Sequence, residues 1–230
     1  MQVGLWVLAH MIAATNRRKS DEVRMPLSLP KGDRRIRPID RFSRTREDYM
    51  LRLQKRLSQE CMAMNIFVLS EDPVEAAIAQ VNRHIVKMPL ETAQMLCAAY
   101  PNGIAPYKKT HYNHPCTVWA RTCIENFNWL VEHGIALCEE YTHRYGRRHK
   151  CQDVIEWCRD NPPTLFTVGK KTAWAVAISD NAVCRIITPN FDSLSVVDMY
   201  REYYIYDKAR IAQWTNRDPP TWWRNIAVIA

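Results

Sequence analysis

Glycine is the residue whose scarcity most restricts the fold. The chain has 6 glycines in 230 residues, against a usual share of about 7%. Few backbone positions can therefore adopt a positive φ, which disfavours barrels and sandwiches with many tight turns. Neither GxGxxG nor GxxxxGK[ST] occurs, so we expect no dinucleotide or P-loop site and no cofactor. We predict a mainly α protein: one compact helical domain with a short N-terminal extended segment.

Charge divides the chain at Met64. Residues 1–63 hold 14 of the 32 Lys and Arg but only 7 of the 24 Asp and Glu, so most of the net charge of +8 belongs there. Their apolar residues show little periodicity, whereas a regular pattern begins at Met64. We predict a basic extension over residues 1–63, either solvated or absent from the native protein, and a helical domain over residues 64–230. Overall basicity is thus weak evidence for nucleic-acid binding, and local patches must carry that argument.

Apolar spacing and turn residues set the expected elements of the domain. Residues 66–69 read as a short buried strand or extended segment, and the SEDP sequence at 70–73 is typical of a helix start. Pro89 is expected to kink or restart a helix, and Gly134 to mark a break in another. Residues 164–190 have the least periodicity. The predicted helices are residues 74–80, 83–100, 115–145, 151–159 and 194–214.

Eight cysteines occur without a CxxC pair. Several have helical spacing among apolar residues, which favours buried, reduced thiols over a disulfide framework. The longest apolar stretch near the N-terminus, residues 3–14, is too short to span a membrane and lacks the features of a secretory signal. We expect a cytoplasmic protein that does not insert into membranes.

Polar residues at helical spacing form the first candidate site. Arg83, Lys87, Glu91 and Gln94 fall on one face of the predicted helix at 83–100. A solvated face with a Lys87–Glu91 pair is one interpretation. The other is a carboxylate held beside cationic phosphate-binding groups.

A polar loop ahead of a helix forms the second. Lys108, Lys109, His111 and His114 precede Pro115, and a helix N-terminus with Lys and His around it can bind phosphate. The alternative is a structured loop whose histidines bond the backbone. The spacing of His111, His114 and Cys116 would suit a metal, but no second cluster completes it, and we predict none.

Two further stretches have both a structural and a nucleic-acid interpretation. Residues 144–150 carry Arg144, Arg147, Arg148, His149 and Lys150, which suit either a helix C-terminus or a DNA backbone. The tyrosines of residues 200–206 suggest a core stripe, with base stacking as the alternative.

Several strings of sequence resemble a small phage protein family. They include MNIFVL at 64–69, HIVKM at 84–88, LETAQML at 90–96 and LCEEYTHRYG at 137–146, and further matches extend to about residue 223. This family is similar to distant pyrimidine-dimer DNA glycosylases, which are compact helical enzymes with glycosylase and lyase activity.

The resemblance implies an amine that attacks the sugar of a damaged nucleotide, and a Glu that stabilises the positive sugar. It places Glu91 as that carboxylate. The glycosylases use an amine exposed after Met removal, but Asn65 after Met64 is a poor context for removal, so Lys87 is the amine we predict. The expected partner is damaged or modified double-stranded DNA, bound by a monomer. The predicted DNA-binding residues are Arg83, His84, Lys108, Lys109, His111, His114, Arg121, Arg144, Arg147, Arg148 and Lys150.

Two other functions stay open on the sequence alone. One is a phage enzyme that modifies bases or nucleotides on the same scaffold without cutting. The other is a DNA- or protein-binding module without catalysis. Cleavage at abasic sites separates the glycosylase from both.

Overall fold

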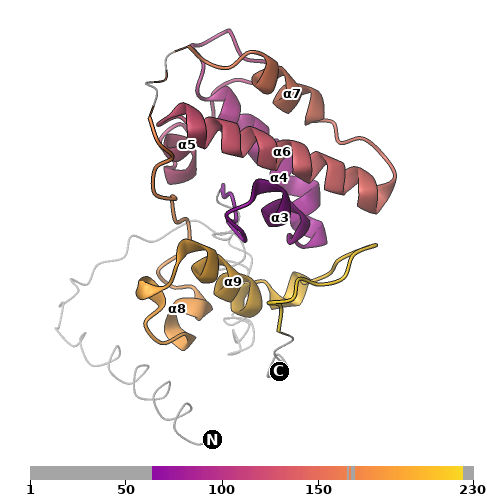
Figure 1. The fold of residues 1–230 in the computed structure, drawn as a ribbon, viewed down its shortest axis with the longest axis vertical. Helices are drawn as coiled ribbons and strands as arrows, with labels where there is room; N and C mark the ends of the chain where they lie inside the picture. Colours follow the sequence, from indigo (N-terminus) through magenta and orange to yellow (C-terminus); the bar gives the residue numbers. More distant parts are fainter. Residues whose placement is uncertain (1–63, 165, 167–168, 225–230) are drawn as a thin grey trace, which may run out of the picture. The chain divides into compact units, whose positions relative to one another are not determined.

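The computed structural model describes residues 64–164, 166 and 169–224, all of which belong to one unit, Met50–Ala230. These residues form helices and connecting segments without a β-strand (Figure 1), which confirms the predicted mainly α fold. The predicted extension at residues 1–63 lies outside the described residues. With the labels of Figure 1, the elements are α3 (Pro73–Ile78), α4 (Asn82–Cys97), α5 (Pro115–Ala120), α6 (Ile124–Tyr145), α7 (Gln152–Asp160), α8 (Val183–Ile187), η1 (Phe191–Ser193), α9 (Val196–Asp207) and η2 (Ala209–Ile211).

Residues 64–69 are buried but belong to no helix or strand, so the alternative of a strand over residues 66–69 is wrong. α3 begins where the SEDP sequence predicts. The Asp72 carboxylate accepts hydrogen bonds from the backbone N–H of Val74 at 2.9 Å and of Glu75 at 2.8 Å, and Pro73 follows it in the first turn. Such a cap satisfies N–H groups that the helix cannot pair.

α4 continues through Pro89, which does not restart the helix. The Pro89 ring is buried in the face that α4 turns inward. This face packs on α5, α6 and α7, and the packing stabilises a helix that lacks one backbone hydrogen bond at the proline.

The long helix predicted over residues 115–145 is broken, but not at Gly134. α5 ends at Ala120, and the side-chain amide of Asn126 donates a hydrogen bond of 2.8 Å to the carbonyl oxygen of Trp119. α6 then runs uninterrupted through Gly134 to Gly146, whose φ of 67° ends it as expected. A Cβ on Gly134 would lie 2.7 Å from Cγ2 of Thr92, so the glycine serves the close approach of α4 and α6.

The C-terminal part differs from the prediction in length. The last long helix is α9, which ends at Asp207, and its cap is Ser195, whose hydroxyl accepts from the N–H of Asp198 at 3.1 Å. The tyrosine stripe is core, because Tyr200 and Tyr204 have no exposed surface. The weakly patterned residues 164–190 include the short helix α8.

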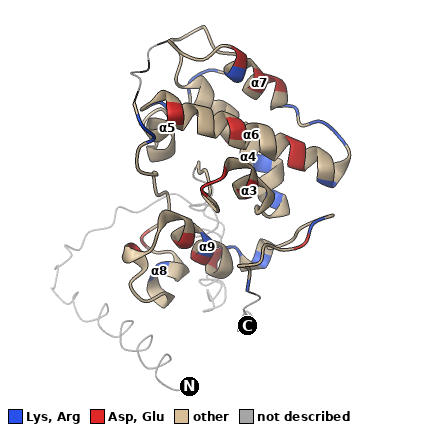
Figure 2. Cartoon of the chain, viewed as in Figure 1, with Lys and Arg blue, Asp and Glu red and all other residues tan. Residues whose placement is uncertain are grey.

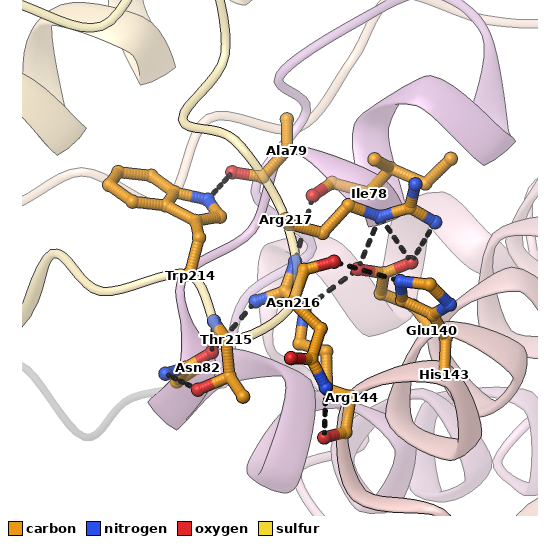
Figure 3. Close-up of polar contacts among 10 residues, drawn as sticks. All are labelled: Ile78, Ala79, Asn82, Glu140, His143, Arg144, Trp214, Thr215, Asn216 and Arg217. Atoms are coloured by element: carbon orange, nitrogen blue, oxygen red, sulfur yellow. Dashed lines mark hydrogen bonds and ion pairs between the residues drawn. The ribbon is translucent and has the colours of Figure 1, made fainter.

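A polar network joins the segment at residues 213–217 to α4 and α6 (Figure 3). Thr215 N–H donates to Asn82 Oδ1 at 2.9 Å, and the indole N–H of Trp214 donates to the carbonyl of Ala79 at 3.1 Å. At its centre, the buried carboxylate of Glu140 pairs with Arg144 and with Arg217, each at 2.7 Å. The network holds the C-terminal segment, and with it α9, against the helices that carry the candidate site.

The seven described cysteines are free and buried, which confirms the prediction of reduced thiols for them. Burial raises the pKa of Cys116 to about 12, so this thiol stays protonated at neutral pH. No helix in the described part of the chain is long and apolar enough to cross a membrane.

Candidate active site and DNA-binding surface

Glu91 is the centre of the first candidate site. It is 6% exposed, and its Oε1 lies 2.6 Å from Nζ of Lys87, one turn earlier on α4. The Lys87 side chain is 39% exposed, so this pair connects a nearly buried carboxylate with the surface. Carboxylates are rarely buried without a partner, and Lys87 is the partner that Glu91 has here.

A second nitrogen reaches Glu91 from the segment at residues 64–69. The backbone N–H of Asn65 donates a hydrogen bond of 3.1 Å to Oε2 of Glu91. The Asn65 side chain is fixed on both sides: Oδ1 accepts from the N–H of Ile66 at 2.8 Å, and Nδ2 donates to the carbonyl of Ala177 at 2.9 Å. Glu91 therefore lies between two nitrogens, one on a side chain and one on the backbone.

Phe67 follows with a left-handed backbone, at a φ of 56°. Such a conformation is costly for an aromatic residue and persists where its surroundings enforce it. Here Asn65 Oδ1 accepts from the N–H of Phe67 at 3.1 Å, and the Phe67 ring stacks on His84 with centroids 4.2 Å apart. The turn thus places an aromatic ring over the same face of α4 that carries Lys87 and Glu91.

His84 is neutral in this arrangement. Burial, with the nearby charges of Lys208 and Lys87, lowers its pKa from 6.5 to about 3. Its Nδ1 lies 2.5 Å from the hydroxyl of Tyr204 on α9. His84 was predicted to bind DNA, but it is 7% exposed. We interpret His84 as a packing residue that connects α9, through Tyr204, with Phe67 beside the site.

α9 also brings Lys208 toward the site. Lys208 is 5% exposed, and its Nζ lies 4.5 Å from the centre of the Tyr203 ring. After burial, the charge of Lys208 is the next contribution that lowers the pKa of His84 on α4. Arg83 is exposed at the start of α4 and Gln94 is half-buried, so of the predicted polar stripe the structure brings together Lys87 and Glu91.

The loop before α5 combines structural and exposed residues. His114 caps α5, because its Nδ1 accepts from the N–H of Cys116 at 3.2 Å, and burial followed by the charge of His111 lowers its pKa. His111 and Lys108 are exposed. Lys109 and Arg121 are half-exposed and lie over the ring of Tyr112. Within the described residues, no group of three or more His, Cys, Asp or Glu could hold a metal.

The basic stretch at residues 144–150 separates into inner and outer members. Arg144 has a fully buried side chain paired with Glu140, so we assign it a structural role. Arg148 is exposed but paired with Asp153 at 2.7 Å and Glu156 at 2.6 Å. Figure 2 shows basic residues on the loop between α6 and α7. Arg147 and Lys150 in this loop are exposed. Arg147 donates a hydrogen bond of 2.9 Å to the hydroxyl of Tyr141 and, like Lys150, forms no ion pair with a described carboxylate.

Sequence reasoning missed Asn65, Phe67 and Lys208. Asn65 and Phe67 lie in a segment without helical periodicity. They contact Glu91 and His84 of α4, and α3 separates the two segments in the sequence, so no local pattern connects them. Their one sequence signal was the MNIFVL string that carried part of the resemblance. Lys208 falls within the helix predicted over residues 194–214, where the tyrosines suggested a core stripe or base stacking and not a lysine near the site; in the structure it directly follows α9.

Residues 64–153 match a family model described as pyrimidine dimer DNA glycosylase. The match confirms the resemblance drawn from the sequence over these residues. They include Asn65, Lys87 and Glu91, the loop before α5, and the basic stretch at residues 144–150. It ends inside α7, so α9 and Lys208 lie beyond it. No curated protein and no solved structure matches the chain.

Proposed function

We propose that the protein is a DNA glycosylase and abasic-site lyase acting on damaged pyrimidines in duplex DNA. The observation that carries this proposal is the nearly buried Glu91 carboxylate with Lys87 Nζ at 2.6 Å and Asn65 N at 3.1 Å. The family match over residues 64–153 supports the class of reaction.

Lys87 is the proposed nucleophile in the chain as it stands, because the nitrogen of Asn65 is an amide here. Lys87 passes a proton from Nζ to Glu91 and becomes a free amine. Nζ then forms a bond to C1′ of the sugar, and the bond from C1′ to the base breaks with its electron pair on the base. The Glu91 carboxyl returns the proton to the departing base.

Nζ then gives up a proton, the bond from C1′ to the ring oxygen O4′ breaks with its electron pair on O4′, and O4′ takes up that proton, which opens the sugar ring and leaves a positive iminium between Nζ and C1′. The carboxylate of Glu91 stabilises this positive charge. Loss of a proton from C2′ then breaks the bond from C3′ to its oxygen, and the phosphate leaves with that electron pair. Water hydrolyses the imine and releases Lys87.

Borohydride trapping on abasic duplex tests this chemistry, because reduction of the imine links protein to DNA. The wild type should trap and cleave. Glu91→Gln keeps the shape of the side chain but removes its charge, so it should bind DNA and lose most cleavage. Lys87→Ala should abolish trapping, whereas the exposed Lys150→Ala should trap like the wild type.

A wild type that neither traps nor cleaves abasic or ultraviolet-irradiated duplex contradicts the proposal. If Lys87→Ala still traps, and a chain that begins at Asn65 traps faster, the nucleophile is the freed Asn65 amine and Lys87 has another role.

A further inference from the structure

An open cleft lies beyond Glu91 on α4. It has a volume of about 490 Å³ and lies between the end of α4, the loop before α5 and the end of α5. Its walls are apolar at Tyr100, Val118 and Phe166 and cationic at Lys109 and Arg121. None of the described residues that line it is Asp or Glu.

Two positive charges converge on one aromatic ring in this cleft. The guanidinium carbon of Arg121 lies 3.5 Å from the centre of the Tyr112 ring, and Nζ of Lys109 lies 5.1 Å from the same centre. Like charges this close repel each other. The ring attracts both cations, but the described residues supply no carboxylate to neutralise either of them.

Arg121 also has an unpaired hydrogen-bond donor. Its Nε is buried without a hydrogen-bond partner among the described residues, and unsatisfied buried donors of this kind are rare. Most other described arginines are paired with carboxylates, as Arg148, Arg159 and Arg224 are. The cations of this cleft therefore have no anionic partner among the described residues, and an anion from outside the chain would supply one.

The position of the cleft relates it to the candidate active site. Ala98, which lines the cleft, lies seven residues after Glu91, a spacing that returns to the same helix face about 10 Å further along α4. That distance is about three nucleotide steps along one DNA strand.

We infer that the Lys109–Tyr112–Arg121 cleft binds a backbone phosphate of the DNA, about three nucleotides from the sugar at Glu91. The inference rests on the proposed function for its ligand. Lys109 and Arg121 neutralise the phosphate, Tyr112 holds the two cations in place, and the apolar wall lies against the adjoining nucleoside. A free nucleotide has the same chemistry and is the other source to be tested.

The test is the salt dependence of binding to a short labelled duplex without a lesion, so that it does not depend on cleavage. The slope of log affinity against log salt should fall by about 0.9 in the double variant K109Q/R121Q, since the variant loses the contact with one phosphate. The matched control R159Q/R224Q loses the same charge from arginines already paired with acids, and should keep the slope. R121K should keep the slope but weaken binding several-fold, because Lys cannot lie flat on Tyr112.

Melting temperatures close to that of the wild type show that the variants fold. An unchanged slope in K109Q/R121Q, or a wild type that does not bind duplex, overturns the inference. So does saturable binding of thymidine 5′-monophosphate that K109Q/R121Q abolishes without a change in the duplex slope, because the cleft then serves free nucleotides. Cleavage with an unchanged slope leaves the proposed function intact, and a reduced slope without cleavage leaves the cleft intact.

Discussion

The buried side chain of His133 makes the stability of the fold depend on pH in acid. It is fully buried and stacks on Trp129 with centroids 5.0 Å apart, and burial lowers its pKa from 6.5 to about 3. Between these values the unfolded chain binds a proton that the folded protein does not, so acid favours unfolding. The free energy of unfolding should therefore fall by up to about 1.4 kcal/mol per pH unit from this residue as the pH drops through that window.

His133→Gln should reduce this slope, measured by urea unfolding at intervals across the window. The exposed Asn128→Ala on the same helix removes no titratable group and is the control, which should leave the slope unchanged. Equal slopes in the wild type and His133→Gln would show that the buried imidazole does not set the acid response.

Glu140 is the residue on which the network of Figure 3 depends. Burial opposes its ionisation, but hydrogen bonds from Arg217 and Arg144 outweigh burial and lower its pKa. Its contribution to stability is therefore present above the ordinary carboxyl pKa and is lost as the pH falls through the lowered value. Glu140→Gln leaves the buried Arg144 without a counter-charge and should lower the free energy of unfolding by about 3–5 kcal/mol.

Urea unfolding at neutral pH measures that loss. Glu202→Gln is the matched control, since Glu202 pairs with an Arg224 whose side chain is 63% exposed, and such pairs contribute about 1 kcal/mol or less. A loss no larger than that of the control would assign the stability of this region to packing instead.

At the scale of elements, Gly134 sets how closely α4 and α6 approach. Gly134→Ala gains about 1 kcal/mol in helix propensity, but its Cβ would lie 2.7 Å from Cγ2 of Thr92 and 3.2 Å from Ile155. We expect the crowding to prevail and the free energy of unfolding to fall by about 1–2 kcal/mol. The exposed Asn128→Ala on the same helix should change it by about 0.5 kcal/mol or less.

Thr92→Ser provides the double-mutant test, because it removes Cγ2 and keeps the hydroxyl. Gly134→Ala should lose less stability in the Thr92→Ser protein than in the wild type. Equal losses in both would mean that Ile155, or the helix itself, is the source of the strain.

At the scale of the molecule, the sequence predicted what depends on local chemistry. Asp72 with Pro73, and Gly146 with its positive φ, fixed two helix ends correctly, and the spacing of Lys87 and Glu91 placed their pair on one helix face. Contacts between distant residues were not accessible in this way. The packing role of Gly134, for example, depends on Thr92 of another helix. The second nitrogen at Glu91 comes from Asn65, and no helical or strand periodicity in the sequence relates Asn65 to α4.

The same distinction leads to a prediction about where the folded unit begins. Residues 64–69 are part of the core, because Ile66, Val68 and Leu69 are 0–1% exposed and Asn65 bonds to Glu91. A chain that begins at Met64 should therefore keep its melting temperature within about 4 °C of the full chain, a shift of about 1 kcal/mol for this size. A chain that begins at Ser70 loses these buried side chains and should not fold cooperatively, since each fully buried apolar side chain contributes about 1.5–3 kcal/mol. Thermal unfolding followed by circular dichroism compares the three chains, and aggregation or a much lower melting temperature of the Met64 chain would show that residues 1–63 contribute to the core.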